Sequence, residues 1–217
     1  MEKHRNTGFL FDLDGVLIDS EKEYSRIWSQ INNEFPTGIE SLEEKIKGTT
    51  LDKILSDYFP DHEIQQSVKE RLYEMESRMK YETKEGVAEL LEGIKNRNKK
   101  MALVTSSNDD KMRHLEEEIP GFIDLFDHVV TSDQISRSKP DPEGYILGAR
   151  KIGCEPKNCV VFEDSVQGIK AGMASGAYVI GIAGTLPGEK LQPYSHRVIE
   201  TLIDFDIDAI IEILENR

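Results

Sequence analysis

Residues 7–17 of the chain read TGFLFDLDGVL, and this stretch decides the fold. The apolar run from Thr7 to Phe11 ends abruptly in acidic residues, as a buried parallel strand does. Asp12 and Asp14 are two residues apart on an extended segment, so both carboxylates point to one side and can share a site. Gly15 then permits a sharp turn or a close approach of the backbone. The stretch therefore predicts a buried strand whose carboxyl end leads into a functional site.

Beyond residue 84 the sequence alternates between helical and extended segments. We expect helices near residues 87–95, 111–118, 142–152, 166–175 and 208–214, and strands near residues 101–105, 128–131, 159–162 and 178–182. Repeated βα units of this length favour a Rossmann-like, mostly parallel sheet with helices on both faces, which is an α/β fold.

The segment between the first strand and this alternating region is polar and helical. Apolar residues recur at helical spacing, and breaks fall at residues 35–38, 47–48 and 59–60, which indicates about four helices. Because the first strand belongs to the same sheet as the later ones, these helices form an insertion. We expect an α/β core from residues 1–19 and 84–217, an inserted helical domain from residues 20–83, and hinges near residues 18–20 and 83–86.

Composition excludes several classes of protein. The chain has 217 residues, of which 38% are hydrophobic and 31% charged, an ordinary balance for a folded protein with a real core. Its net charge of −14, with no basic block, argues against a nucleic-acid partner. No apolar run approaches the ~20 residues of a membrane span, and the polar amino terminus has no signal-peptide core. We expect a cytoplasmic monomer, with Cys154 and Cys159 as small buried apolar residues.

Acidic residues also end another apolar strand. Glu163 and Asp164 follow Val160-Val161-Phe162, and the carboxyl ends of parallel strands meet at one edge of a sheet, where ligands bind. Four acidic groups at one edge repel one another unless a cation lies among them. Oxygen ligands without histidine suit Mg²⁺ better than zinc.

Two further segments at this edge supply groups for a phosphate. Thr105, Ser106 and Ser107 offer hydroxyls and backbone N–H groups where a strand turns into a helix, a place that favours anions. Lys139 lies between Ser138 and Pro140, where it would balance the carboxylates and hold a phosphoryl oxygen.

These four segments, in this order, resemble the signature motifs of the haloacid dehalogenase-like hydrolase superfamily. The run Asp-x-Asp-Gly-Val-Leu-x-Asp-Ser from Asp12, the block Ser-Lys-Pro-Asp-Pro around Lys139, and Phe-Glu-Asp-Ser-x-x-Gly from Phe162 are most similar to its β-phosphoglucomutase-like phosphatase branch. The resemblance covers nearly the whole chain, and it implies that the inserted helices are a cap over the active site.

The resemblance also implies a role for each residue. Asp12 would attack phosphorus to form an aspartyl-phosphate, and Asp14 would be the general acid and base. Thr105, Ser106, Ser107 and Lys139 would bind the phosphoryl oxygens. Mg²⁺ would be held by Asp12, the Asp14 carbonyl and Asp164, with Glu163 as a further ligand or an anchor. We expect a lowered pKa for Asp12 beside Mg²⁺ and Lys139, and a raised pKa for Asp14 among the carboxylates.

Residues of the cap distinguish a phosphatase from a sugar phosphomutase. In β-phosphoglucomutases a His would fall at Tyr24 and an Arg at Leu51, whereas the pair Lys47-Gly48 is retained here. Loss of the Arg removes a grip on the distal phosphate, so we favour a Mg²⁺-dependent phosphatase of a small phosphorylated metabolite, such as a sugar phosphate, over a sugar phosphomutase. A non-catalytic binding module is less consistent with the intact motifs.

Within the cap, Tyr24, Lys47 and Thr50 are the predicted substrate contacts. For Trp28 and Lys53 we favour a core position and a solvated helix face, respectively.

Overall fold

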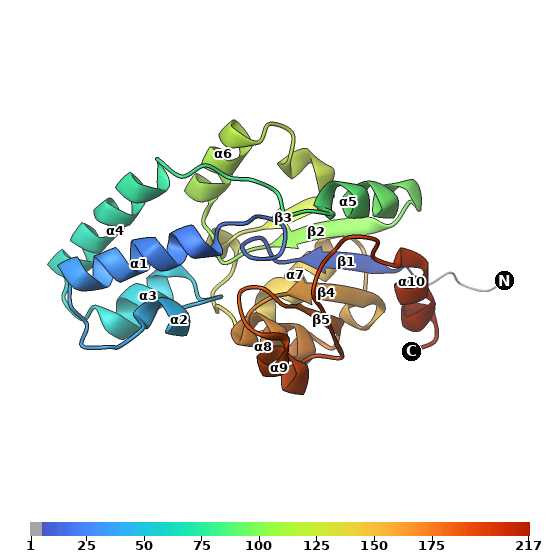
Figure 1. The fold of residues 1–217 in the computed structure, drawn as a ribbon. Helices are drawn as coiled ribbons and strands as arrows, with labels where there is room; N and C mark the ends of the chain where they lie inside the picture. Colours follow the sequence, from blue (N-terminus) through green and yellow to red (C-terminus); the bar gives the residue numbers. More distant parts are fainter. Residues whose placement is uncertain (1–5) are drawn as a thin grey trace.

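The computed structural model describes residues 6–217. Residues 1–5, which include most of the polar amino terminus and the start of the predicted core segment, lie outside the described residues. A six-stranded sheet with the order β3-β2-β1-β4-β5-β6 forms the centre of the molecule, and every neighbouring pair is parallel (Figure 1). The strands are β1 (Gly8–Phe11), β2 (Lys100–Val104), β3 (His128–Val130), β4 (Cys159–Glu163), β5 (Tyr178–Ile182) and β6 (Arg197–Ile199).

Strand β1 lies in the middle of the sheet and is buried and parallel, as the apolar run from Thr7 predicts. Phe11, its last residue, aligns with Leu103 of β2 on one side and with Phe162 of β4 on the other. The strand order reverses between β1 and β4, and crevices for ligands form at such switch points, outside the carboxyl ends of the strands. This register brings the residues that follow β1, β2 and β4 to one edge.

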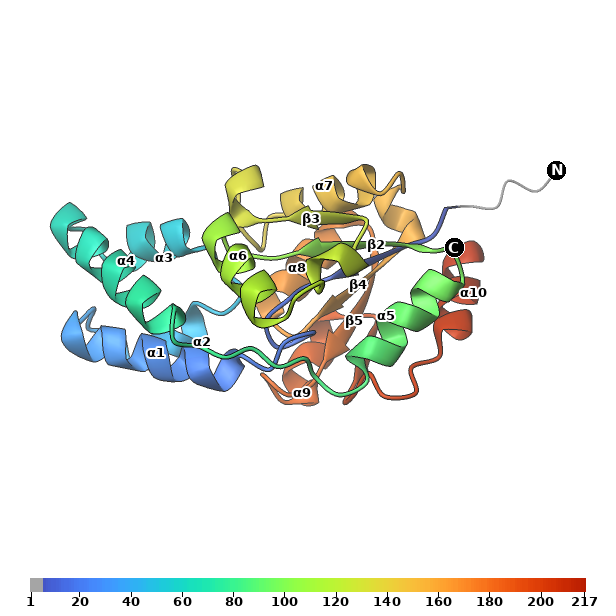
Figure 2. The same cartoon turned by 90° about the horizontal axis from the view of Figure 1, so that it is seen from above.

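Two apolar layers cover the sheet, because successive residues of a strand point to opposite faces. Phe9 and Phe11 belong to one buried cluster, and Leu10 belongs to the other. Helices α5 (Val87–Asn96), α6 (Asp109–Glu118) and α10 (Ile207–Glu215) pack on the first face, and α7 (Glu143–Lys151) and α8 (Val166–Ser175) on the second (Figure 2). The helices on both faces confirm the α/β class.

The helical insertion lies beyond the carboxyl edge of the sheet, at the left of Figure 1. It holds α1 (Glu21–Glu34), α2 (Leu42–Lys45), α3 (Leu51–Tyr58) and α4 (His62–Glu76), which matches the expected four helices. Ile27, Trp28 and Ile31 on α1 are buried in its core. The two connecting segments pair with each other: the Asp19 N–H donates to the Glu82 carbonyl at 3.0 Å, and the Lys84 N–H to the Leu17 carbonyl at 2.9 Å.

Sequence patterns missed the short elements. The sixth strand, Arg197–Ile199, has three residues, too few for a periodic signal. Helix α9 (Gly188–Leu191) and the 3₁₀ turns were also missed, and these turns are Ile123–Leu125, Ser132–Gln134, Pro156–Asn158 and Gln192–Tyr194. Helix α6 begins at Asp109, two residues before the predicted start, because Asn108 caps it. Among residues 6–217, no helix has the length and apolar character that crossing a bilayer requires.

Candidate active site

Three buried carboxylates meet at the carboxyl edge of the sheet. Asp12 follows β1, while Glu163 ends β4 and Asp164 follows it. These residues are 7%, 0% and 2% exposed, and each offers a carboxylate oxygen that lies within 4.8 Å of those of the other two. The strand register therefore brings together the acidic groups that the sequence predicts, although about 150 residues separate the two segments.

Lys139 is the cation nearest to this cluster. Its ammonium group donates to Asp12 Oδ1 and to Glu163 Oε1, both at 2.5 Å, and the side chain is buried. Burial opposes the charge, but the two carboxylates outweigh it and raise the pKa of Lys139. One positive charge thus faces three carboxyl groups.

Glu163 is fully engaged by protein donors. Lys139 and the Tyr145 hydroxyl donate to its Oε1, the latter at 2.9 Å. The N–H groups of Asp164 and Ser165 and the Ser165 hydroxyl donate to its Oε2, each at 3.0 Å. Gly168 leaves room for the carboxylate, since a Cβ there would lie 1.6 Å from Glu163 Oε1. With both oxygens saturated, Glu163 suits anchoring Lys139 better than binding a metal.

Asp164 remains more open. The Thr185 hydroxyl donates to its Oδ2, and no other side-chain partner is found within the described part of the chain. Gly15 approaches closely: its φ is +75°, and a Cβ would lie 1.8 Å from Asp164 Oδ2. The glycine after the two aspartates therefore allows the first and fourth segments to meet.

The donor set fits a divalent cation of the Mg²⁺ type. Asp12 and Asp164 supply carboxylate oxygens that are not saturated by donors, and His and Cys are absent from the cluster. Burial raises the pKa of Asp12 to about 7, with the Glu163 and Asp14 charges adding to the effect and Lys139 opposing it. Burial and the charges of Glu163 and Asp12 raise the pKa of Asp164 well above its usual range. Buried carboxylates whose negative charge is not balanced by nearby cations show raised pKa values of this kind.

Asp14 has a different environment. Lys111 donates to its Oδ2 at 2.6 Å and the Ser107 hydroxyl at 3.3 Å, while the Ser20 hydroxyl donates to Oδ1. Burial works against ionisation, but the charge of Lys111 and these hydrogen bonds outweigh it and lower the pKa of Asp14. With the protein groups alone, the shifts of Asp12 and Asp14 run opposite to the sequence expectation. For Asp14 the reason is Lys111, which that expectation did not include. For Asp12 it is burial, whereas the expected lowering assumed a bound Mg²⁺.

Lys111 is the residue that sequence analysis missed. It lies in the first turn of α6, is 8% exposed, and its ammonium group is 4.1 Å from the centre of the Tyr24 ring. The first turn of a helix favours acidic side chains, so a lysine directly after Asp109 and Asp110 is an anomaly that could have drawn attention to it.

The predicted phosphate-binding loop connects β2 to α6. The Thr105 hydroxyl is buried and accepts from the Ser107 N–H at 3.0 Å, so it shapes the loop rather than lining the cleft. Ser106 and Ser107 line the cleft, and their hydroxyls already donate to the Gly48 carbonyl (3.0 Å) and to Asp14. The Ser106 contact joins the core to the helical insertion.

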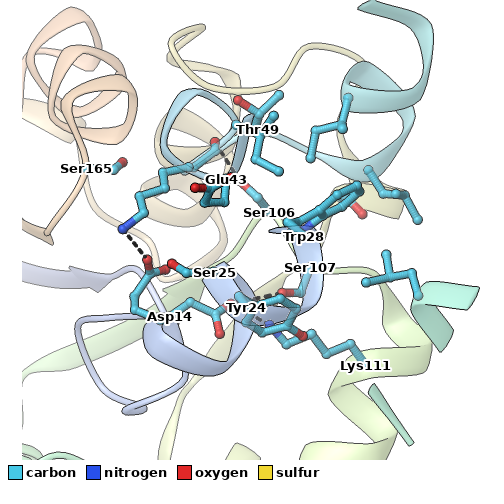
Figure 3. A pocket seen from close by; sticks show the side chains of 18 of the residues that line it. Asp14, Tyr24, Ser25, Trp28, Glu43, Thr49, Ser106, Ser107, Lys111 and Ser165 are labelled. Carbon is cyan, nitrogen blue, oxygen red and sulfur yellow. Dashed lines mark hydrogen bonds and ion pairs between the residues drawn. The ribbon is translucent and has the colours of Figure 1, made fainter. Parts of the chain in front are cut away.

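A cleft lies between the carboxylates and the inserted helices. Its empty volume is about 930 Å³, part of it open solvent, which is ample for a small metabolite. Tyr24 and Lys47 line it as predicted, but Lys47 pairs with Glu21 at 3.0 Å. Trp28 belongs to the apolar core and also lines the cleft (Figure 3).

Thr50 is the exception among the predicted cap contacts. It lines a second, polar groove between α3 and residues 132–141, together with Lys53, whereas Thr49 lines the main cleft. Thr50 precedes α3, and its extended backbone turns the side chain away from its neighbour's position. The prediction of a substrate contact therefore fits Thr49 better than Thr50.

Known proteins share this architecture. A phosphorylated carbohydrates phosphatase from Thermotoga maritima is 34% identical over 77% of this chain and 80% of its own length. A β-phosphoglucomutase from Bacillus subtilis is 25% identical over 82% and 84% of the two chains. The crystal structure of a hydrolase from Pseudomonas syringae covers 95% of this chain and 99% of its own with a TM-score of 0.83 at 24% identity, which shows the same fold.

The sequence profile of one family spans both the sheet and the inserted helices. It matches residues 9–182, from the central strand β1 to the end of β5, and so includes all the strand-end segments described above. The chain belongs to the haloacid dehalogenase-like hydrolase family.

Proposed function

We propose that this protein hydrolyses small phosphate monoesters with Mg²⁺, through an aspartyl-phosphate on Asp12. The observation that carries the proposal is the cluster of Asp12, Glu163 and Asp164, whose ligand atoms lie within 4.8 Å of one another, with Lys139 as its nearest cation. Asp12 has one oxygen held by Lys139, which leaves the other to attack phosphorus.

The chemistry then follows in two displacements. In the first, Asp12 forms a bond to phosphorus while the bond to the leaving oxygen breaks, and the protonated form of Asp14 gives that oxygen its proton and becomes a carboxylate. In the second, water attacks the aspartyl-phosphate, Asp14 takes a proton from the water, and Asp12 is released with inorganic phosphate. The lowered pKa of Asp14 suits the second step, where it is the base.

Charge stabilisation comes from groups around the transferring phosphoryl group. Lys139 and N–H groups of the loop of Ser106 and Ser107 would bind its oxygens, where negative charge collects in the transition state. Asp12, the Asp14 carbonyl and Asp164 would hold Mg²⁺, with Glu163 anchoring Lys139. When bound, the cation neutralises charge on the phosphoryl oxygens.

We also propose that residues 20–83 act as a cap over the core of residues 1–19 and 84–217. The cleft is lined by both parts, and the contact between Ser106 and Gly48 spans them. Closure would exclude water from the loaded site.

Phosphate release from a panel of monoesters, with Mg²⁺ and with a chelator, tests the proposal. We expect turnover of at least one ester with Mg²⁺ and its loss with the chelator. An intact protein that released no phosphate from any ester would contradict the proposal.

A phosphomutase is supported less well. The Tyr24 hydroxyl donates to Glu76 at 2.8 Å, and Leu51 presents an apolar side chain to the cleft, so neither position offers a cation to a distal phosphate. A non-catalytic role would not account for three buried carboxylates that share the single ammonium group of Lys139.

The raised pKa values predict an unusual pH dependence of stability. Asp12 has a pKa of about 7 in the folded chain, against an ordinary aspartate pKa of 3.8 in the unfolded chain, so the folded state binds more protons between these values. The contribution of Asp12 to the free energy of unfolding of the metal-free protein should therefore fall as pH rises from about 4 to 7, and level off above. Thermal melts across this range check the slope, which Asp12→Asn should reduce.

Mg²⁺ should offset this loss at high pH. Binding to the folded state alone adds about 2.7 kcal/mol at a hundredfold excess over Kd. The rise in melting temperature should be larger at about pH 8 than at about pH 6, because the carboxyl groups must lose protons to bind the ion. A rise that was equal at both pH values, or absent, would contradict the assignment of the metal site.

A further inference from the structure

The basic side chains that line the cleft are already paired. Among the described residues of the lining, only Lys47 and Lys111 are basic. Lys47 lies 3.0 Å from a Glu21 carboxylate oxygen, and Lys111 lies 2.6 Å from Asp14 Oδ2. Lys111 also lies over the Tyr24 ring (Figure 3), which leaves little of its ammonium group for a ligand. A carboxylate next to each lysine therefore offsets its positive charge toward an anionic group of a substrate.

The inserted helices contribute further carboxylates to the same wall. Glu43 of α2 and Glu76 of α4 both line the cleft. Glu76 accepts a hydrogen bond from the neutral Tyr24 hydroxyl, and Lys111, the cation whose charge acts on it, is bound to Asp14. Within residues 6–217, Glu43 has no ion-pair partner. Two acidic groups therefore lack a matching cation.

Apolar and aromatic side chains form most of the rest of the cap wall, with Ser25 and Thr49 as polar members. The apolar and aromatic members are Trp28, Ile46, Leu51, Ile54, Leu72 and Tyr73. Figure 3 shows Trp28, Tyr24 and Glu43 around the same opening as Asp14. A leaving group in the cleft meets apolar surface and carboxylate acceptors on this side, with no free cation on the wall.

We infer that the leaving group of the substrate carries no second anionic group: the site takes monoesters of neutral or cationic alcohols and rejects bisphosphates and phosphorylated acids. The inference rests on the proposed phosphatase function. A second phosphate or carboxylate would lie against the charges of Glu43 and Glu76, and such a repulsive element gives specificity as effectively as an attractive contact does. The same property disfavours a phosphomutase, whose cycle passes through a sugar bisphosphate.

A matched pair of substrates tests the inference. Glycerol 3-phosphate and 3-phosphoglycerate share a three-carbon skeleton and differ in a hydroxymethyl against a carboxylate group. We expect kcat/KM to be about tenfold or more higher for glycerol 3-phosphate at low ionic strength, and the ratio to shrink as salt screens the repulsion. Equal values for the two esters would overturn the inference while the phosphatase function stands.

Variants identify the groups responsible. Glu43→Gln and Glu76→Gln should each reduce the ratio several-fold, mainly by raising kcat/KM for 3-phosphoglycerate. Glu44→Gln is the matched control, because Glu44 is exposed on the same helix and does not line the cleft. If the ratio stayed unchanged in both variants, with melting temperatures close to the wild type, the inference would be wrong. Failure to release phosphate from any ester with Mg²⁺ would instead remove the phosphatase function, and the inference with it.

Discussion

Asp12→Asn should reduce kcat for phosphate release by roughly 10⁴-fold or more, because an amide cannot supply the carboxylate that attacks phosphorus. The change keeps the shape of a buried side chain that lies 2.5 Å from Lys139. Steady-state phosphate release with Mg²⁺ measures the effect. Activity within about tenfold of the wild type would exclude a covalent route through Asp12.

Stability provides the control for this variant. Burial and neighbouring carboxylates raise the pKa of Asp12 to about 7, so its charge is unfavourable in the folded chain above that pH. Removing the charge relieves repulsion from Glu163 while Lys139 keeps Glu163 as a partner. We therefore expect the melting temperature of the metal-free variant at about pH 8 to be at least as high as that of the wild type.

Lys139→Ala should cost both activity and stability. The loss of one charged donor to the transferring oxygens reduces kcat by about 10²- to 10³-fold. The same change leaves Asp12 and Glu163 buried without their cation. Removing one partner of a buried ion pair costs about 3–5 kcal/mol, so we expect a loss of folding stability of this size. Kinetics and chemical denaturation measure the two effects separately.

Arg137→Ala is the matched control for Lys139→Ala. Arg137 lies two residues earlier on the same loop, but its side chain is 68% exposed and pairs with Asp141 and Glu143 at the surface. Exposed pairs contribute little, so its removal should change stability by less than about 1 kcal/mol and leave kcat unaffected. Equal losses of kcat and of stability in the two variants would indicate that the effects come from disturbing the loop and not from removing the ammonium group of Lys139.

Much of the core follows from short-range patterns. The helix Val166–Ser175 and the strand Tyr178–Ile182 have the predicted bounds, because Ser165 caps the helix, Gly176 ends it, and the strand is a continuous apolar run. The meeting of Asp12 with Asp164 could be expected because parallel strands align their carboxyl ends. The strand order, which places β1 between β2 and β4, makes that meeting possible.

The cap side of the site was less predictable. Lys111, Glu43 and Glu76 belong to no recognisable motif, and each reaches the cleft only through the packing of its helix. The lowered pKa of Asp14 depends on one such contact, its ion pair with Lys111. Substrate-facing side chains are set by tertiary contacts, so no spacing rule reveals them. The cytoplasmic location and the monomeric state stay predictions.

The pairing of the two connecting segments has a consequence for how such chains diversify. Asp19 and Glu82 are hydrogen bonded, as are Leu17 and Lys84. The inserted residues between these pairs therefore leave the core and return to it at neighbouring positions. The insertion is therefore connected to the core in the same way as a long surface loop whose two ends lie close together. Such loops tolerate changes in length and sequence. Substitutions or insertions in the inserted helices, or their replacement by another domain, can change the substrate specificity. The strands that align the reacting groups keep their register.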